Sequence, residues 1–264
     1  MKMETRKKQN QLDRLRIIAA GGGAPHADSA PAIREGLSLS NVDKPSVLII
    51  PSAKRTAVSF ERAIPATKEF FRRMGLSVAL LHNFNQAINT EDALEMINTA
   101  DFVYTAGGDT LHMLEQLRKA KIESAIADKA LRGELVLSGV SAGAIMPMAW
   151  GHSDSLSYRP EASDTWDYIR VDGMGLVPTA ITPHYNTINE RLGARSDKFH
   201  TMLTEQGDDL GFGIDNYAAL RIADGNITQF QSNPNNFIHV VRNNNNRITS
   251  EPMTASDSIR LSEL

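Results

Sequence analysis

The segment from Gly139 to Gly143 contains the residues best suited to catalysis, because its sequence is Gly-Val-Ser-Ala-Gly. An apolar run at 135–137 precedes it and small apolar residues at 144–146 follow it, so the pattern predicts a strand, a sharp turn and a helix. The hydroxyl of Ser141 would lie exposed at the end of a sheet, beside backbone N–H groups suited to an oxyanion. Glycine at both ends allows neighbouring backbone to approach closely. A turn without chemistry is the alternative, but this context favours a nucleophile.

A serine hydroxyl is a poor nucleophile until a base removes its proton. The candidate bases are the seven histidines His26, His82, His112, His152, His184, His200 and His239. His112 and His200 fall inside predicted helices and His239 in a late strand, where packing or surface roles are expected. His184 ends a predicted strand, which is where loops converge on the active site of a parallel sheet. We therefore predict that His184 is the base.

A carboxylate usually orients the imidazole of such a base. Asp154 follows the predicted elbow helix closely, and Asp164, Asp167 and Asp172 lie in the same polar stretch. Each of the four could equally be a surface aspartate. The residues alone do not choose among them.

Strands and helices alternate along the chain up to the elbow. Predicted strands cover 16–20, 46–50, 77–81, 102–105 and 135–137, and predicted helices cover 60–74, 91–99, 110–119 and 122–132. This alternation predicts an α/β fold in which a mostly parallel central sheet has helices on both faces. Glycines at 21–23 and 107–108 follow two of the strands, at the edge where ligands bind in such sheets.

The composition changes after the elbow. The polar stretch 153–172 is expected to form an irregular wall beside the nucleophile. A strand at 180–182 and a helix at 197–205 follow, and then short strands at 211–214, 218–222, 227–230 and 238–241, which predict a C-terminal antiparallel meander. Because no linker or repeat divides the chain, we predict a single α/β domain over 16–264, after a basic tail or short helix at 1–15.

Composition excludes several classes of protein. The 264 residues have a formal net charge of −3, which argues against a general nucleic-acid binder, and the lack of cysteine excludes disulfides and a cysteine nucleophile. Residues 1–15 lack the apolar core of a signal peptide, and no apolar run approaches the ~20 residues of a membrane helix. We expect a cytoplasmic protein whose partner is a small peptide, without nucleic acid, membrane, cofactor or metal. Whether it forms a homodimer stays open.

Several segments, in the right order, resemble the dipeptidase E and cyanophycinase family of serine peptidases. They are Ala106-Gly-Gly-Asp-Thr-Leu-His-Met-Leu114, Gly139-Val-Ser-Ala-Gly-Ala144, Ser153-Asp154, Asp172-Gly-Met-Gly-Leu-Val-Pro178 and Pro183-His-Tyr185, and they lie within residues 16–222. The resemblance implies a fold like that of the class I glutamine amidotransferases, and not the standard α/β-hydrolase fold.

The resemblance also implies roles for individual residues. It makes Ser141 the nucleophile, His184 the base and Asp154 the acidic third member of a triad. It places the oxyanion hole at the backbone N–H groups of Gly108 and Ala142.

Further residues are assigned to the substrate or depart from the family pattern. Arg195 matches a family arginine that binds the acidic side chain of the substrate, and Tyr185 and Asn186, directly after His184, are predicted to contact the substrate as well. Asp109 stands where the family usually has asparagine. We expect its carboxylate to point away from the oxyanion hole and to cap the following helix.

The expected activity is hydrolysis of small aspartyl peptides of the Asp-X type through an acyl-enzyme. A cyanophycinase-like hydrolase of β-aspartyl-arginine peptides is the nearest alternative. An esterase is disfavoured because Asp154 follows Ser141 by 13 positions and 80 residues follow His184, unlike the usual α/β-hydrolase order. A non-catalytic small-molecule sensor is disfavoured because serine, histidine and aspartate are all present.

Overall fold

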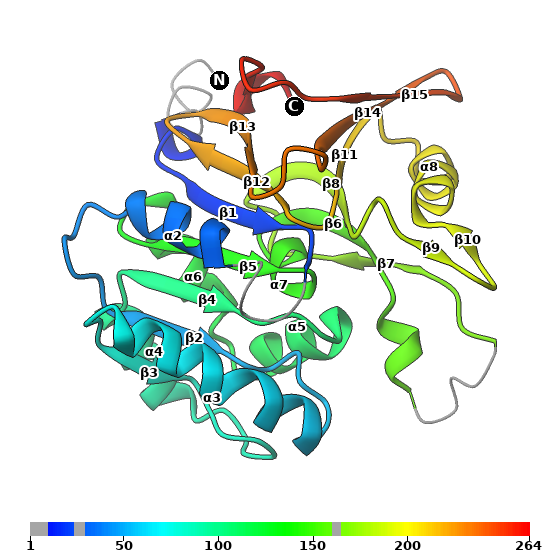
Figure 1. Ribbon diagram of the computed structural model, residues 1–264. Coiled ribbons are helices and arrows are strands. Elements are labelled where there is room, and N and C mark those ends of the chain that lie inside the picture. The colour runs from blue at the N-terminus through cyan, green and yellow to red at the C-terminus, as the bar shows by residue number, and fades with distance from the viewer. Residues whose placement is uncertain (1–9, 24–29, 160–164) are drawn as a thin grey trace.

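The computed structural model describes residues 10–23, 30–159 and 165–264 (Figure 1). Its larger sheet has eight strands in the order β16-β13-β12-β1-β5-β4-β2-β3. The parallel strands are β1 (Arg16–Ala20), β5 (Val136–Val140), β4 (Phe102–Thr105), β2 (Val47–Ile50) and β3 (Val78–Leu80). The strands β12 (Ala218–Ala223), β13 (Asn226–Gln231) and β16 (Ile259–Arg260) extend this sheet in antiparallel pairing.

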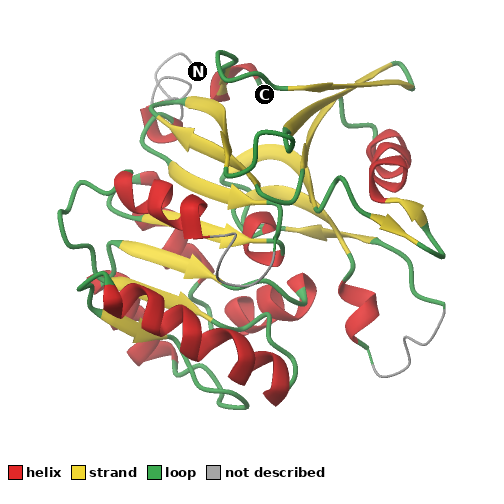
Figure 2. Cartoon of the chain, viewed as in Figure 1, coloured by secondary structure: helices red, strands yellow, loops and turns green. Residues whose placement is uncertain are grey.

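Helices cover both faces of the larger sheet, as predicted (Figure 2). They are α2 (Ala30–Ser38) and α3 (Ala57–Arg73) on one face, and α4 (Thr90–Thr99), α5 (Thr110–Lys119) and α6 (Glu123–Leu131) on the other. Successive strand residues point to opposite faces. Ile18 accordingly belongs to the buried cluster that contains Phe71 of α3, whereas Ile17 belongs to the cluster that contains Met113 of α5.

A second, six-stranded sheet has the order β15-β14-β11-β8-β6-β7. Its strands are β6 (Met148–Ser153), β7 (Ile169–Asp172), β8 (Val177–Pro183), β11 (Leu210–Ile214), β14 (Ile238–Asn244) and β15 (Arg247–Pro252). The remaining elements of the second half are the single-turn α7 (Ala142–Ile145), the 3₁₀ turn η1 (Ser155–Tyr158), the short pair β9 (Ile188–Asn189) and β10 (Gly193–Ala194), α8 (Arg195–Gln206) and the 3₁₀ turn η2 (Leu261–Glu263).

The C-terminal region is largely antiparallel, as predicted, with β12 paired to β13 and β14 paired to β15. These two pairs lie in different sheets, so the strands do not form one meander. The expected irregular stretch 153–172 contains η1 and ends in β7, and it includes residues 160–164, which lie outside the described part. β7 was not predicted because it is an edge strand in which only Val171 is buried and the residues on either side of it are exposed and polar.

One buried cluster spans both sheets, since it includes Ile17 of the larger sheet and Val177 and Phe212 of the smaller. Leu12 and Leu15 are buried in the same cluster, so the end of the predicted N-terminal tail packs on the core; residues 1–9 lie outside the described part. None of the helices in the described part is long and apolar enough to cross a membrane.

The two sheets meet where their strands end. The N–H of Ser141, directly after β5, donates to the carbonyl of Ala20 at 2.9 Å, and the N–H of His184, directly after β8, donates to the carbonyl of Gly21 at 3.0 Å. The end of β1 therefore anchors both residues, and the fold brings the predicted nucleophile and base to one place.

Candidate active site

Ser141 lies in the turn between β5 and α7 with a backbone φ of +56°. This left-handed conformation is strained for a residue other than glycine and is typical of a nucleophile elbow. The turn is tight, because a Cβ atom on Gly139 would lie 2.3 Å from the backbone of Gly143, and one on Gly143 would lie 2.3 Å from the carbonyl oxygen of Thr105. The two glycines that flank the serine are thus required by the available space.

His184 directly faces the serine. Its Nε2 lies 2.9 Å from Oγ of Ser141, and its Nδ1 lies 2.8 Å from Oδ1 of Asn216. Because an amide oxygen can only accept a hydrogen bond, Nδ1 carries the proton and the lone pair of Nε2 faces the hydroxyl. This tautomer is the one that a general base needs.

The surroundings of His184 favour its neutral form. Burial, followed by the positive charge of Arg195, lowers the pKa of His184 from its ordinary 6.5, while the hydrogen bond to Asn216 and the charge of Asp154 oppose that shift. The imidazole is therefore available as a base at neutral pH and somewhat below it.

Asn216 occupies the position expected for the acid of the triad. It lies in the loop between β11 and β12, and its N–H donates to Oδ1 of Asn186 at 3.0 Å. The backbone of Gly22 lies against it, because a Cβ on Gly22 would lie 2.4 Å from Oδ1 of Asn216 and 2.2 Å from Cε1 of His184. The absence of a side chain at Gly22 therefore provides the space in which the imidazole of His184 and the amide of Asn216 are in contact.

The structure corrects the expected contact between Asp154 and His184. Oδ2 of Asp154 lies 3.6 Å from Nη1 of Arg195, and no hydrogen bond joins it to His184 in the described part. The sheet order explains why Asn216, and not Asp154, contacts His184, because β8 has β11 on one side and β6 on the other. β11 runs parallel to β8 and carries Asn216 to the imidazole, whereas β6 ends just before Asp154 and carries it to Arg195.

The rival aspartates have other partners. Oδ2 of Asp167 lies 3.3 Å from Nζ of Lys198, and Oδ1 of Asp172 accepts a hydrogen bond from Nε of Arg170 at 2.8 Å. Asp164 lies outside the described residues. Neither described rival therefore takes the place beside the imidazole.

Arg195 is the first residue of α8 and is 4% exposed. Its Nη2 donates to the carbonyl of His152 at 2.9 Å, its Nε donates to Oγ1 of Thr182 at 3.3 Å, and its guanidinium carbon lies 4.7 Å from the ring centroid of Tyr168. Asp154 is its only ion-pair partner in the described part. A buried guanidinium near the imidazole of His184 is well suited to a carboxylate.

Tyr185 and Asn186 both have protein partners that support the loops of the site. The hydroxyl of Tyr185 is hydrogen-bonded to Nε2 of His200 at 2.8 Å and to Oγ of Ser250 at 2.7 Å, and the ring is buried beneath α8. The expected substrate contact of Tyr185 is therefore not available, because its one polar group already has two protein partners. Oδ1 of Asn186 accepts a hydrogen bond from the N–H of Asn216, and a substrate contact of its exposed side chain remains a prediction.

The expected oxyanion hole lies at the loop after β4. A Cβ on Gly107 would lie 3.2 Å from Cβ of Ser141, so this loop borders the nucleophile. A Cβ on Gly108 would lie 2.2 Å from the carbonyl oxygen of Ala53, which explains the glycine there. The backbone N–H groups of Gly108 and Ala142 remain the proposed oxyanion donors.

Asp109 caps α5, as expected. Its Oδ1 accepts a hydrogen bond from the N–H of His112 at 3.1 Å, and its Oδ2 lies 3.1 Å from Nη1 of Arg55. The carboxylate is buried, and both of its oxygens have protein partners. Its charge is thus directed into the helix end and the ion pair, away from a developing oxyanion.

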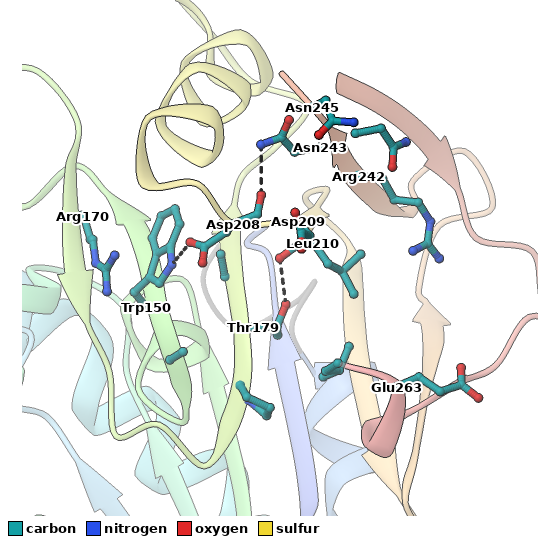
Figure 3. Close-up of a pocket in the computed structure, with 15 residues that line it drawn as sticks. Trp150, Arg170, Thr179, Asp208, Asp209, Leu210, Arg242, Asn243, Asn245 and Glu263 are labelled. Carbon is teal, nitrogen blue, oxygen red and sulfur yellow. Dashed lines mark hydrogen bonds between the residues drawn. The ribbon is translucent and has the colours of Figure 1, made fainter. Parts of the chain in front are cut away.

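A larger cavity of about 710 Å³ lies away from these residues (Figure 3). Trp150, Arg170 and Asp208 line it, and Nε1 of Trp150 donates to Oδ2 of Asp208 at 2.7 Å. The cavity borders the first half of β8, whereas His184 follows the end of that strand. It is therefore distinct from the candidate active site.

The third position of the triad can be tested by substitution. Asn216→Ala should lower kcat by on the order of 100-fold or more, because the imidazole loses the acceptor that fixes its tautomer. The acid limb of the kcat/KM profile should also move to lower pH, since that hydrogen bond raises the pKa of His184. Steady-state kinetics across pH would measure both effects.

The matched control is Asp154→Asn, which keeps shape and removes charge. We expect it to change kcat less than Asn216→Ala does. If Asp154→Asn cripples the enzyme while Asn216→Ala is benign, the acid first expected from the sequence is the working one and the observed hydrogen bond is not.

Comparison with known proteins shows the family of the chain. A sequence profile of peptidase family S51 matches residues 17–230. A cyanophycinase of Trichormus variabilis is 24% identical over 211 residues, which is 78% of this chain and 66% of the relative. A peptidase E of Salmonella paratyphi A is 28% identical over 142 residues, which is 53% of this chain and 55% of the relative.

A solved structure shares the fold. The crystal structure of a peptidase from an acI-B1 actinobacterium superposes with a TM-score of 0.68 at 20% identity, over 93% of this chain and 96% of the other. The resemblance noted from the sequence is therefore confirmed at the level of family and fold.

Proposed function

We propose that this chain, which belongs to peptidase family S51 and is a serine-type peptidase, hydrolyses short peptides after an aspartyl residue. The observation that carries the proposal is the hydrogen-bonded chain from Ser141 through His184 to Asn216, with the buried guanidinium of Arg195 beside it. Relatives named peptidase E and cyanophycinase support the peptide class.

In the proposed reaction, Oγ of Ser141 attacks the scissile carbonyl carbon while Nε2 of His184 takes the hydroxyl proton. The tetrahedral oxyanion rests on the N–H groups of Gly108 and Ala142. The imidazolium then gives its proton to the leaving amine, which breaks the C–N bond and leaves an ester on Ser141. A water activated by His184 hydrolyses that ester.

The aspartyl preference rests on Arg195. Within the described residues its hydrogen-bond partners are neutral, and its one carboxylate partner there, Asp154, lies at the long distance of 3.6 Å. The positive charge is thus only partly compensated in a buried place, and a substrate carboxylate would complete the compensation. Because the planar guanidinium presents two parallel donors, it matches a carboxylate better than a lysine would.

Arg195→Met should weaken hydrolysis of Asp-X peptides by roughly 2–5 kcal/mol in kcat/KM, the range for loss of one partner of a buried charge pair. Hydrolysis of a matched Asn-X peptide should fall much less. The acid limb of the profile should move to higher pH, because the charge of Arg195 lowers the pKa of His184. Kinetics on the peptide pair at several pH values would check these results.

Arg195→Lys serves as the control and should restore only part of the activity, because a point charge cannot reproduce the fork of donors. A thermal melt of each variant distinguishes a folding defect from a loss of recognition. Equal losses on acidic and neutral peptides would assign Arg195 to structure alone.

Hydrolysis of β-aspartyl-arginine peptides is the second candidate, because the cyanophycinase relative matches a larger share of this chain than the peptidase E relative does. A panel of α-aspartyl and β-aspartyl dipeptides with the purified protein separates the two. Faster hydrolysis of the α-linked series supports the first candidate, and faster hydrolysis of the β-linked series supports the second.

A further inference from the structure

A second cavity, of about 330 Å³, opens beside the candidate active site at the carboxyl ends of β2 and β3. Its lining includes Lys54 and Arg55 after β2, His82 after β3 and His112 of α5. None of its described lining residues is an aspartate or a glutamate. The cavity therefore offers cationic and imidazole groups without a carboxylate on its own wall.

Lys54 contributes a positive charge to this cavity. Its ammonium makes no hydrogen bond or ion pair within the described part of the chain, and burial lowers its pKa from 10.5. By contrast, Arg55 is paired with Asp109 at 3.1 Å, and Nε2 of His82 is hydrogen-bonded to Oγ of Ser52 at 2.8 Å. A half-buried ammonium without a partner is stabilised by any anion that reaches it.

The cavity also has an apolar side. The rings of Phe60 and Phe84 line it and pack against each other with their centroids 5.8 Å apart. A ligand that carries a carboxylate next to an aliphatic or aromatic group would satisfy both sides at once. The C-terminal residue of a peptide has this combination.

The cavity is connected to the proposed oxyanion loop through Ala53, which lies between the lining residues Ser52 and Lys54. The carbonyl of Ala53 accepts a hydrogen bond from the N–H of Asp109 at 2.9 Å and lies against Gly108, while Gly107 borders Ser141 on the other side of the same loop. In the sheet order β5-β4-β2, the cavity therefore begins two strands away from the nucleophile. Arg195, by contrast, contacts residues of the second sheet, Thr182 of β8 and His152 of β6.

The separation indicates how long a bound peptide must be. Two strand spacings of about 4.8 Å place the cavity roughly 10 Å from the end of β5. An extended chain advances about 3.3–3.6 Å per residue. The C-terminal carboxylate of a dipeptide cannot reach that far from the scissile bond, whereas a peptide with two or three residues after the bond can.

We propose that this cavity binds the C-terminal carboxylate of a short peptide substrate, with Lys54 as its ion-pair partner and Phe60 and Phe84 in contact with the terminal side chain. This inference rests on the proposed function and extends it. It makes the protein selective for tri- and tetrapeptides with a free C-terminus and an apolar last residue, and not for dipeptides alone.

The test compares Asp-Ala-Leu and Asp-Ala-Ala-Leu, each as free acid and as C-terminal amide, with the dipeptide Asp-Leu as a substrate too short to reach Lys54. The full-length protein should hydrolyse one or both longer acids about 10- to 100-fold faster in kcat/KM than the matching amide, the effect of one charge-assisted contact. Lys54→Met should abolish this difference by lowering the rate on the acid alone. It should leave hydrolysis of Asp-Leu unchanged.

The matched control is Lys44→Met, which removes an exposed lysine from the loop before β2 and should preserve the preference for the acid. Equal rates on acid and amide in the unmodified protein would overturn the proposal. An equal fall on acid, amide and dipeptide in Lys54→Met would overturn it too, because such a fall indicates a structural role.

A binding measurement separates this proposal from the proposed function. The leaving peptides Ala-Leu and Ala-Ala-Leu have no aspartate to be cleaved, and calorimetry can measure their binding to the unmodified protein and to Lys54→Met. Tighter binding of the acids than of their amides, lost in Lys54→Met, supports the cavity even if no aspartyl peptide is hydrolysed. Equal binding of acid and amide contradicts it even if hydrolysis of Asp-Leu is fast.

Discussion

Ser141→Ala is expected to lower kcat for aspartyl peptides by about a million-fold, as in other serine triads. Alanine has the same backbone preferences as serine at a φ of +56°, so the elbow should keep its shape. The loss should therefore appear in kcat, with little change in substrate binding or in the melting temperature. Single-turnover kinetics and a thermal melt of the purified variant would measure both quantities.

The matched control is Ser138→Ala, three residues earlier and within β5, where the hydroxyl is buried and outside the proposed chemistry. That variant should retain activity within a small factor. Near-normal hydrolysis by Ser141→Ala would remove Ser141 from the mechanism altogether.

His184→Ala is expected to have an effect of similar size, because without a base the hydroxyl of Ser141 keeps its proton. In the unmodified protein the acid limb of kcat/KM should lie below pH 6.5, since burial and the charge of Arg195 lower the pKa of His184 and its neutral form is the active one. The variant should lose that limb. A pH profile of both proteins would show this.

The double variant Ser141→Ala, His184→Ala should be barely slower than either single variant, because the two residues act as a unit. Additive losses would show that they act independently. His200→Ala provides a control histidine, since His200 belongs to α8 and its Nε2 is hydrogen-bonded to the hydroxyl of Tyr185, and it should affect stability more than kcat.

The sequence predicted the parallel part of the larger sheet well, because its strands and helices alternate and each of its strands is a short, mostly apolar run. β2 and β4 are buried along their whole length, which is typical of parallel strands covered on both faces. β7 escaped prediction because it is a short edge strand with an exposed arginine and aspartate. Its pairing with β6 is a long-range contact that local patterns do not record.

The nucleophile and its base were predictable because each follows a strand that can be recognised locally. Asn216 was missed because its place depends on the parallel pairing of β11 with β8, in which Ile214 lies opposite Pro183. The signal was present, since Asn216 follows the end of a predicted strand just as His184 does. It becomes informative only once the two strands are known to be neighbours.

Tyr185 shows the opposite error. Its position next to His184 suggested a substrate contact, but adjacent residues at a strand end point to different sides. The ring therefore packs beneath α8 while the imidazole faces Ser141. The position of Tyr185 next to His184 thus identified the correct loop, but its side chain points away from the candidate active site.

Covalent labelling tests the central claim most directly, namely that Ser141 is a nucleophile activated by His184. The purified protein would be treated with a fluorophosphonate probe and digested, and the modified peptide would be identified by mass spectrometry. We predict one adduct on Ser141 that abolishes peptide hydrolysis in proportion to labelling, and strongly slowed labelling in His184→Ala. Aspartyl peptide hydrolysis that continues in fully labelled protein, or labelling at another residue that accounts for the inhibition, would contradict the claim.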